Sequence, residues 1–420
     1  MFKGYKLSQP TFQFSQGSSR SSSDVFARKP LDLNQTSYLE RRSWKRLSPL
    51  IVSELPLTKE IERTYNNLFF GALGYQGMNK IFELEVENFV NVPKIDLCKN
   101  FQTKAVEQTC LKYKNMNIAL SFLRIKSPNS DLLKAILNYH GIATQGITSR
   151  IVEFSSEKQL IEKGRRNYSN ILRNLMIEIY AKCGGVPWSL SKPLRKTYYV
   201  GIAWGYLPSY YIFTITVFDS YGLPKYEHFR TDFMHRDEEF SKCIEKVAER
   251  LAQTVPGGSR ITIHYHGSFM GAEAVFQEKL KGKFDFIMLS VERPADPYFR
   301  FYNKDLTDNL AEKGIVVILD EKRAILSATG YPDFGIQGVP AAIFLESGEW
   351  LNQEELLAEV QDVYNLSQLN WAHARGYHKL PVTTLLASNI VWRLQKIHSL
   401  REKHGLTVNL SQPINYRCFW

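Results

Sequence analysis

The chain has 420 residues, of which 44% are hydrophobic and 13% aromatic. This length suits two or three domains, and the apolar content excludes a mostly disordered protein. The formal net charge is +11, and the excess is local: residues 101–200 hold 16 Lys and Arg against six Asp and Glu, whereas residues 201–420 hold 23 against 26. Such a basic segment indicates a site for a polyanion, with nucleic acid as the leading candidate and a solvated basic surface as the alternative.

The apolar stretches of the sequence are too short to cross a membrane. The longest are Ile315–Leu319 and Ala341–Leu345, whereas a bilayer needs roughly 18 residues. The N-terminus lacks the apolar block of a secretory signal, and the five cysteines form no CxxC pair, so neither a disulfide framework nor a zinc motif is indicated. We therefore expect a reduced, cytoplasmic protein without membrane insertion.

The first 100 residues carry no recognisable domain pattern. Residues 8–36 are rich in Ser, Gln and Asn without apolar periodicity, which predicts an arm that is disordered or becomes ordered on a partner. In Lys80–Asn88 three apolar residues alternate with three glutamates, the pattern of a strand with one wet, acidic face. An exposed strand edge can pair with another chain. We assign residues 1–100 to an N-terminal arm and partner-docking segment.

Residues 117–153 predict a strand, a helix and a strand, which is half of a doubly wound α/β domain. The first strand is Asn117–Leu123, the helix ends near Gly141, and the second strand lies within Ile147–Phe154. The turn Ser127–Ser130 supplies the residue types that begin a helix.

A second helix is predicted over Asn167–Lys182, where Gly184 and Gly185 supply the glycine stop. Asn174 and Lys182 lie eight residues apart on this helix, so they share one of its faces and can act on one ligand together.

From residue 197 onward the pattern changes to long strands. Three strands, a helix, a strand, a helix and a strand are predicted in succession: Tyr198–Trp204, Tyr210–Asp219, Lys225–Thr231, Asp237–Thr254, Arg260–His266, a helix from Met270, and Phe284–Val291. Three consecutive strands followed by alternating helix and strand is the order of an RNase H-like α/β domain.

Several motifs, taken in this order, resemble Argonaute proteins. Those similar to the MID domain are Thr144-Gln145 after a helix with Lys134, then Asn174, then Ala181–Trp188 (AKCGGVPW). Those similar to the PIWI domain are Tyr199–Trp204 (YVGIAW), Ile263–Gly267 (IHYHG) and Leu380–Thr383 (LPVT). The resemblance covers about residues 100–420 and leaves no room for a PAZ domain, as in short prokaryotic Argonautes. It implies an α/β fold with a Rossmann-like MID domain at 101–190 and an RNase H-like PIWI domain at 191–420.

The resemblance implies a pocket for the 5′-phosphate of a guide strand. A terminal phosphate carries up to two charges and needs Lys donors, amide donors and often a divalent cation. The residues that match the family's pocket are Lys134, Gln145, Asn174, Lys182 and the C-terminal carboxylate of Trp420, the last of which is expected to hold Mg²⁺ together with Gln145. Ser130 stands where the family commonly has Tyr, His or Arg. Each Lys alone fits a solvated helix surface equally well, and a helix stop alone explains Gly184 and Gly185.

Active PIWI domains cut their target with a tetrad of carboxylates, the last sometimes His, because two divalent cations need hard oxygen ligands. The matching positions are Ala203, His266 and Ser388, and none is acidic. This predicts a PIWI domain that does not slice. The alternative is a guided RNase H-like nuclease with a displaced carboxylate set, drawn from Asp219, Asp232, Glu238 and Glu239.

Two histidines of one predicted strand form a further candidate. His264 and His266 share one strand face and are one ligand short of a typical metal site. We expect them to have packing or surface roles.

Short prokaryotic Argonautes use small guide RNAs against complementary single-stranded DNA. They work with an APAZ-containing effector protein in prokaryotic immunity. The resemblance implies these partners. A structural subunit that binds only protein is the third alternative.

Overall fold

The computed structural model describes residues 3–13, 19–21, 46–72, 75–98, 103–113, 116, 118–127, 129–155, 165–292, 313–328, 342–369, 371, 380–405 and 415–419. Contacts divide the chain into two compact units. One is built mainly from residues 189–395 with N-terminal strands, and the other mainly from residues 27–188 together with 396–420. We call them the 189–395 unit and the 27–188 unit.

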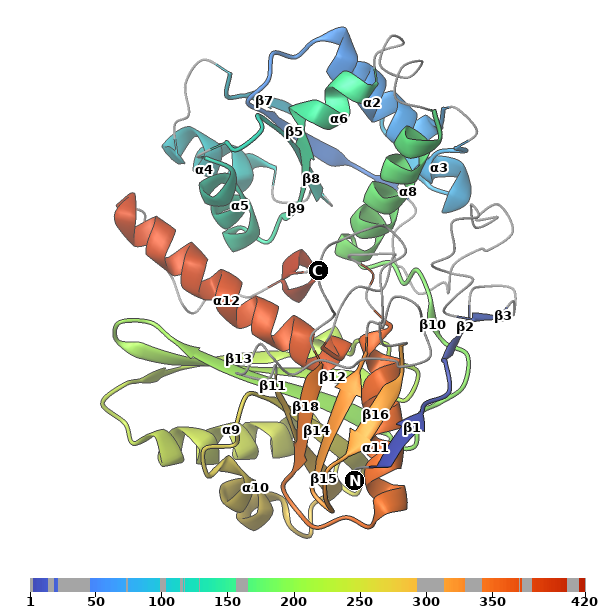
Figure 1. Cartoon of the computed structure of the whole chain (residues 1–420). Helices are drawn as coiled ribbons and strands as arrows, with labels where there is room; N and C mark the ends of the chain where they lie inside the picture. Colours follow the sequence, from blue (N-terminus) through green and yellow to red (C-terminus); the bar gives the residue numbers. More distant parts are fainter. Residues whose placement is uncertain are drawn as a thin grey trace. The chain divides into compact units, whose positions relative to one another are not determined.

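The 27–188 unit is organised around a parallel sheet with the strand order β7-β5-β8-β9. The four strands are β5 (Pro49–Ser53), β7 (Lys94–Asp96), β8 (Ile118–Leu123) and β9 (Ala143–Thr148). Every residue of β5 and β8 is buried, because helices cover both faces of the sheet (Figure 1). This is the predicted Rossmann-like arrangement.

Helices surround this sheet. They are α2 (Lys59–Phe70), α3 (Met78–Ile81), α4 (Thr103–Lys112), α5 (Ser130–Tyr139), α6 (Ser149–Phe154) and α8 (Arg165–Lys182). The predicted helix ending at Lys182 is confirmed. The strand predicted within Ile147–Phe154 is wrong, because β9 ends at Thr148 and the extended Thr148 (φ −79°, ψ 157°) begins α6. One apolar run thus serves two elements.

The predicted boundary at residue 100 does not coincide with the division into units. Strand β5 pairs with both β7 and β8, so residues 49–96 share a sheet with residues 118–148. The predicted acidic strand is also shorter than expected: Lys80 and Ile81 end α3, and only β6 (Glu85–Val86) is strand. It pairs with β4 (Arg46–Leu47).

The 189–395 unit contains a nine-stranded sheet with the order β1-β16-β17-β18-β15-β14-β11-β12-β13. Its strands are β1 (Lys3–Lys6), β11 (Tyr198–Tyr206), β12 (Tyr210–Asp219), β13 (Arg230–His235), β14 (Arg260–His266), β15 (Asp285–Glu292), β16 (Ile315–Ile318), β17 (Arg323–Ser327) and β18 (Ile343–Ser347). Strands β11, β12 and β13 form an antiparallel meander, and β14 and β15 continue parallel to β11. This is the predicted RNase H-like order.

One predicted strand of the meander is displaced. In place of a strand over Lys225–Thr231 the structure has the short helix η3 (Tyr226–His228) followed by β13. Strand β13 pairs along the first half of β12, from Ile215 opposite Arg230 to Tyr210 opposite His235. The prediction is wrong because Lys225–Phe229 belong to the connection between β12 and β13, and the strand begins only at Arg230.

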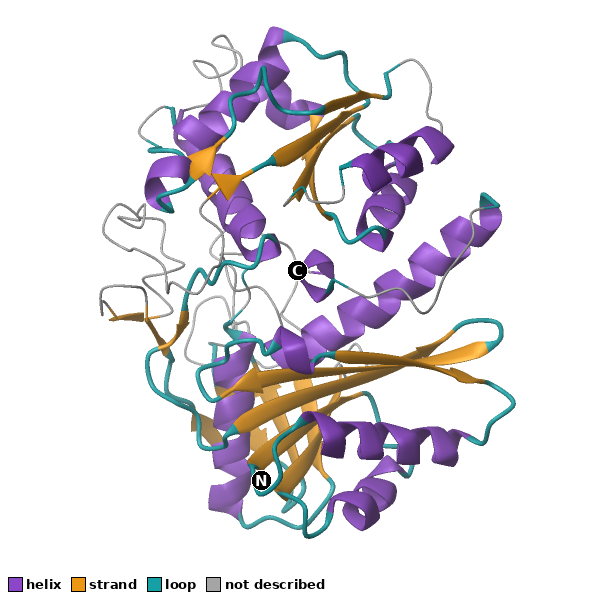
Figure 2. Ribbon diagram, turned by 180° about the vertical axis from the view of Figure 1, so that it is seen from behind, coloured by secondary structure: helices purple, strands orange, loops and turns teal. Residues whose placement is uncertain are grey.

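Four helices cover the large sheet: α9 (Phe240–Thr254), α10 (Ala272–Leu280), α11 (Gln353–Ser367) and α12 (Val382–Lys403). Helices α9 and α10 pack on one face through a core that includes Ile202 and Met288. Helices α11 and α12 lie on the other face, through cores that include Leu289 and Ala203 (Figure 2). Neighbouring strand residues alternate between the two faces, as the pleat requires.

The N-terminal segment is ordered by this unit. Strand β1 pairs antiparallel with β16, and Leu7 lies in the core beneath α11. Strands β2 (Thr11–Gln13) and β3 (Ser19–Ser21) pair with each other, and β10 (Ser189–Leu190) pairs with β2. The predicted arm, disordered or ordered by a partner, is therefore wrong for residues 8–13 and 19–21, because β2 pairs with β10 far along the chain and β3 pairs with β2. The rest of that prediction lies outside the described residues.

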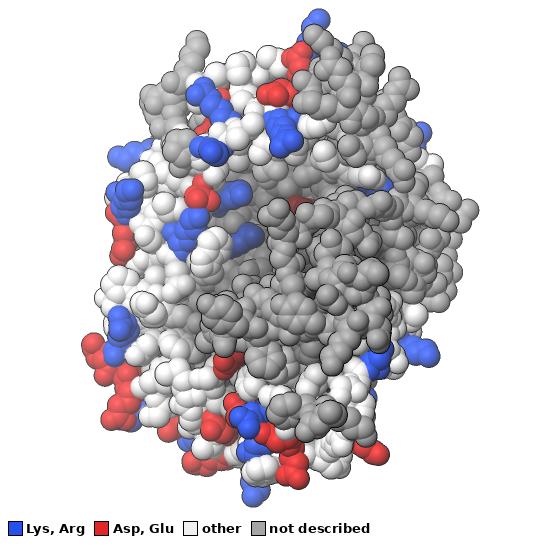
Figure 3. All heavy atoms as spheres, in the orientation of Figure 1, with Lys and Arg blue, Asp and Glu red and all other residues white. Residues whose placement is uncertain are grey.

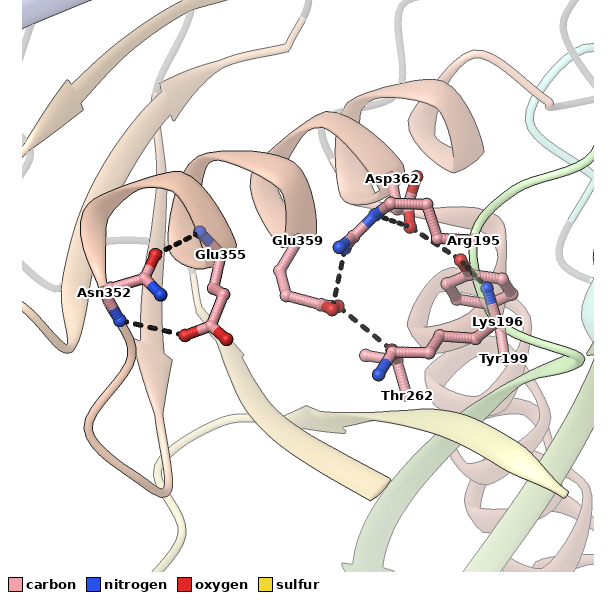
Figure 4. A network of polar contacts seen from close by, with 8 residues as sticks. All are labelled: Arg195, Lys196, Tyr199, Thr262, Asn352, Glu355, Glu359 and Asp362. Carbon is pink, nitrogen blue, oxygen red and sulfur yellow. Dashed lines mark hydrogen bonds and ion pairs between the residues drawn. The ribbon is translucent and has the colours of Figure 1, made fainter. Parts of the chain in front are cut away.

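A buried polar network fixes α11 to the sheet (Figure 4). Arg195 donates to Glu359 at 2.7 Å and to Asp362 at 3.2 Å. Tyr199 donates to Asp362 at 2.6 Å, and Thr262 donates to Glu359 at 3.0 Å. Burial raises the pKa of Asp362 to about 6. The two carboxylates tolerate burial because the guanidinium and two hydroxyls satisfy them.

The charged side chains are unevenly distributed. In Figure 3, most of the charged side chains drawn on the 27–188 unit are Lys and Arg, whereas the 189–395 unit shows Asp and Glu mixed with Lys and Arg. This agrees with the basic segment at residues 101–200.

Among the described residues, no helix combines the length and the apolar character that spanning a membrane requires.

Candidate nucleic-acid site

The end of α8 and the start of β9 bring two predicted pocket residues together. The Lys182 ammonium donates to Oε1 of Gln145 at 2.7 Å and to the backbone carbonyl of Thr144 at 3.1 Å. Lys182 is only 8% exposed and Gln145 only 6%. Both acceptors are neutral oxygens, and the Glu178 carboxylate lies 4.0 Å away, at the outer limit of an ion pair. The described hydrogen bonds of the ammonium thus go to dipoles, and a buried positive charge attracts an anion.

The two other described pocket candidates differ in their position. Lys134 on α5 is partly exposed and lies beside β9, since a Cβ added to Gly146 would be 3.8 Å from Cε and 4.0 Å from Nζ of Lys134. It therefore borders the same strand as Gln145. Asn174 on α8 is partly exposed, and its side chain has no described contact with the Lys182–Gln145 pair.

The C-terminal residues lie next to this pair. The short helix η4 (Tyr416–Phe419) packs against α8 and β9. Trp420 lies outside the described residues, so its expected role stays a prediction. The sequence analysis missed Arg417, whose guanidinium lies against Gly184. No local sequence signal could have found it, because the contact joins segments far apart in the chain.

The residues predicted for the three PIWI positions come from β11, β14 and α12. Ala203 on β11 is buried in a core with Ala387 of α12. His266 ends β14 directly after Tyr265, which pairs with Ile202, so Ala203 and His266 are next to each other in the register. Ser388 follows Ala387 and donates to the carbonyl of Leu385 at 3.1 Å. Ala203 and His266 thus lie on neighbouring strands, and none of the three residues at these predicted positions is acidic.

His264 has the packing role that the sequence predicts. It is fully buried, and Nδ1 lies 2.8 Å from the hydroxyl of Thr383. Burial lowers the pKa of His264 to about 3, so the ring is neutral at physiological pH. Among the described residues there is no group of three or more His, Cys, Asp or Glu that could hold a metal ion.

The carboxylates of the alternative nuclease each have a cationic partner. They pair as Asp219 with Lys225, Asp232 with Arg250, Glu238 with Lys246 and Glu239 with Lys242. Asp219 lies opposite Tyr198 at one end of β11, five residues from Ala203. Asp219 is therefore not beside Ala203.

The chain combines a Rossmann-like unit with an RNase H-like unit, and the Rossmann-like unit contains the Lys182–Gln145 pair. This combination of units is an Argonaute-like fold. Two solved structures of Argonaute from Aquifex aeolicus match with TM-scores of 0.67 and 0.65, both at 18% identity, covering 94% and 99% of this chain and 53% and 57% of theirs. A structure of Aa-Ago with externally bound siRNA matches with a TM-score of 0.67 and 16% identity, over 98% of this chain and 56% of that one. The chain thus spans little more than half the length of these proteins. No protein-family model and no curated protein matches it.

Proposed function

We propose that this chain binds a small guide strand, an RNA, by its 5′-phosphate and recognises complementary single-stranded DNA through base pairing without cutting it. The observation that carries the proposal is the buried Lys182 ammonium held by Gln145 and a backbone carbonyl. In such a system the protein supplies shape and charge, and pairing supplies sequence.

The electrostatics of the pair favour a terminal phosphate over a neutral ligand. A dianionic phosphate forms stronger hydrogen bonds with an ammonium than a neutral ligand does, because both partners are charged. Lys182 lies at the end of α8 with its ammonium at β9, where such a phosphate would meet it. The siRNA of the Aa-Ago structure supports a small nucleic acid as the class of ligand, and the excess of Lys and Arg in residues 101–200 suits its backbone.

Mg²⁺ belongs to the proposal together with the phosphate. Oε1 of Gln145 already accepts a hydrogen bond from the Lys182 ammonium, so a cation at this oxygen would lie beside a positive charge. Gln145 alone would therefore not hold Mg²⁺. The ion fits only when the phosphate and the Trp420 carboxylate supply negative charge at the same place.

The absence of cutting is proposed from the residue types at the three positions that match the family's carboxylates. Ala203 supplies no oxygen ligand, and His266 and Ser388 are not carboxylates, whereas two-metal cleavage needs several hard oxygen ligands. The protein would therefore act by signalling target recognition to an APAZ-containing effector in the cytoplasm, as part of prokaryotic immunity.

The test begins with the nucleic acid that co-purifies with the protein. We expect short strands of one length class with a 5′-phosphate, whereas their absence, together with equal binding of 5′-phosphorylated and 5′-hydroxyl RNA, would exclude guide binding. The loaded protein is then incubated with complementary DNA and Mg²⁺ or Mn²⁺. Cleavage at a single guided position would favour the nuclease with the displaced carboxylate set.

A further inference from the structure

The Arg417 side chain lies where a side chain of residue 184 would otherwise be. A Cβ added to Gly184 would be 2.6 Å from Cζ and from Nη1 of Arg417 and 2.9 Å from Nε. These distances are far below van der Waals contact. Gly184 also has φ +91°, a value that L side chains rarely adopt. The absent side chain thus leaves the guanidinium room to lie against the backbone at the end of α8.

The turn that carries Arg417 is anchored to the 27–188 unit. The Asn415 amide donates to the carbonyl of Gly141 at 2.9 Å, and its Oδ1 accepts from the backbone N–H of Arg417 at 3.2 Å. Cys418 and Phe419 are buried at 1% and 2% exposure. The backbone of Arg417 is therefore held on both sides, while the residue itself is exposed to solvent.

The same turn lies beside the Lys182–Gln145 pair. It packs on both α8 and β9, the two elements that carry Lys182 and Gln145, and Gly184 follows Lys182 by two residues. The charges of Lys182 and Arg417 both oppose the effect of burial on the pKa of Cys183, so both act at this one place. Lys134 borders β9 from α5. Lys134 and Lys182 thus lie at β9, and the turn that carries Arg417 packs on the same strand.

A phosphate needs more donors than Lys182 can give. An ammonium has three N–H donors, and Lys182 commits two of them to Gln145 and Thr144. It can therefore bring at most one more hydrogen bond to a ligand. A guanidinium offers five donors in a planar fork that matches two phosphate oxygens at once.

We infer that Arg417 is a further ligand-binding residue of the 5′-phosphate site and that Gly184 is the seat that positions its guanidinium. This inference rests on the proposed function. It gives Gly184 a role beyond ending a helix, and it makes the segment 415–419 part of the site through a side chain.

The test measures binding of one short single-stranded RNA, with a 5′-phosphate or a 5′-hydroxyl, to the full-length protein at fixed ionic strength. Arg417→Ala should weaken binding of the phosphorylated strand by about tenfold to a hundredfold, as for a lost charged hydrogen bond, and leave the hydroxyl strand unchanged. Arg417→Lys should restore part of the loss, since it keeps the charge without the fork. Arg46→Ala is the matched control: Arg46 is an exposed arginine of the same unit, paired with Glu87.

Gly184→Ala tests the seat independently. It should lower the preference for the phosphorylated strand over the hydroxyl strand, and the double variant Gly184→Ala/Arg417→Ala should have the same preference as Arg417→Ala alone, because both changes remove one contact and the backbone strain at residue 184 affects both strands equally. Should Arg417→Ala keep the full preference of the parent for the 5′-phosphate, the inference is overturned and the proposed function stands. A parent protein without that preference overturns both.

Discussion

Replacement of Lys182 by Met tests the site at its centre. Methionine keeps a long apolar stem and removes the charge and both hydrogen bonds to Gln145 and Thr144. A hydrogen bond to a charged group contributes about 1.5 to 3 kcal/mol, so affinity for a 5′-phosphorylated guide should fall roughly ten- to 150-fold.

Stability should change less than affinity in this variant. The loss leaves the buried oxygens of Gln145 and Thr144 without the ammonium, which costs about 1 to 3 kcal/mol. The same change removes the desolvation penalty of a buried charge, which offsets much of that cost. Urea unfolding of the free protein measures the change in stability separately from the change in guide affinity.

The assay compares the 5′-phosphate and 5′-hydroxyl forms of one guide strand, with Lys80→Met, an exposed lysine of the same unit, as the control. The hydroxyl form should bind Lys182→Met and the parent almost equally. An equal loss for both forms would place Lys182 away from the phosphate and refute the reasoning.

Three other predictions concern both units. The His264 ring is neutral in the folded protein but can protonate in the unfolded chain, so the unfolded state binds more protons between about pH 3 and 6.5. The free energy of unfolding should therefore fall as the pH drops through that window, by up to about 1.4 kcal/mol per pH unit. Urea unfolding at several pH values should show a weaker dependence of this free energy on pH for His264→Asn than for the parent. Gly201→Ala should destabilise by about 1 to 3 kcal/mol or more, because its Cβ would lie 2.3 Å from the carbonyl of Thr383, whereas Gly257→Ala, with nothing within 4 Å, should not; equal melting temperatures would contradict this packing. A tag fused after Trp420 should lower guide affinity and abolish its dependence on Mg²⁺, while an N-terminal tag should do neither; unchanged Mg²⁺-dependent binding would remove Trp420 from the site.

The sequence predicts correctly the strands and helix ends that depend on interactions between residues close together in the chain. Strands β12 and β14 have the predicted bounds, and α8 ends at Lys182 as predicted, because apolar periodicity and a glycine stop act within a few residues. The pairing of Lys182 with Gln145 was also within reach, since the motif order of a known family implied it.

Contacts between distant segments could not be predicted in this way. Strand β5 belongs to the centre of the parallel sheet only because β7 and β8 flank it, and its own sequence does not specify partners. The contact of Arg417 with Gly184 depends on a turn more than 200 residues further along the chain. A single arginine near a chain end carries no pattern that points to such a neighbour.

The division of the chain has a consequence for synthesis on the ribosome. The 27–188 unit includes residues 396–420, and its Lys182–Gln145 pair leaves the exit tunnel long before the Asn415 and Arg417 that lie beside it. Domains fold largely in the order in which they are made. Here, however, the turn that carries Arg417 can pack against α8 and β9 only after the whole 189–395 unit has been translated. A nascent chain that ends before residue 415 should therefore retain 5′-phosphorylated strands poorly, so stable loading of a guide would follow translation rather than accompany it.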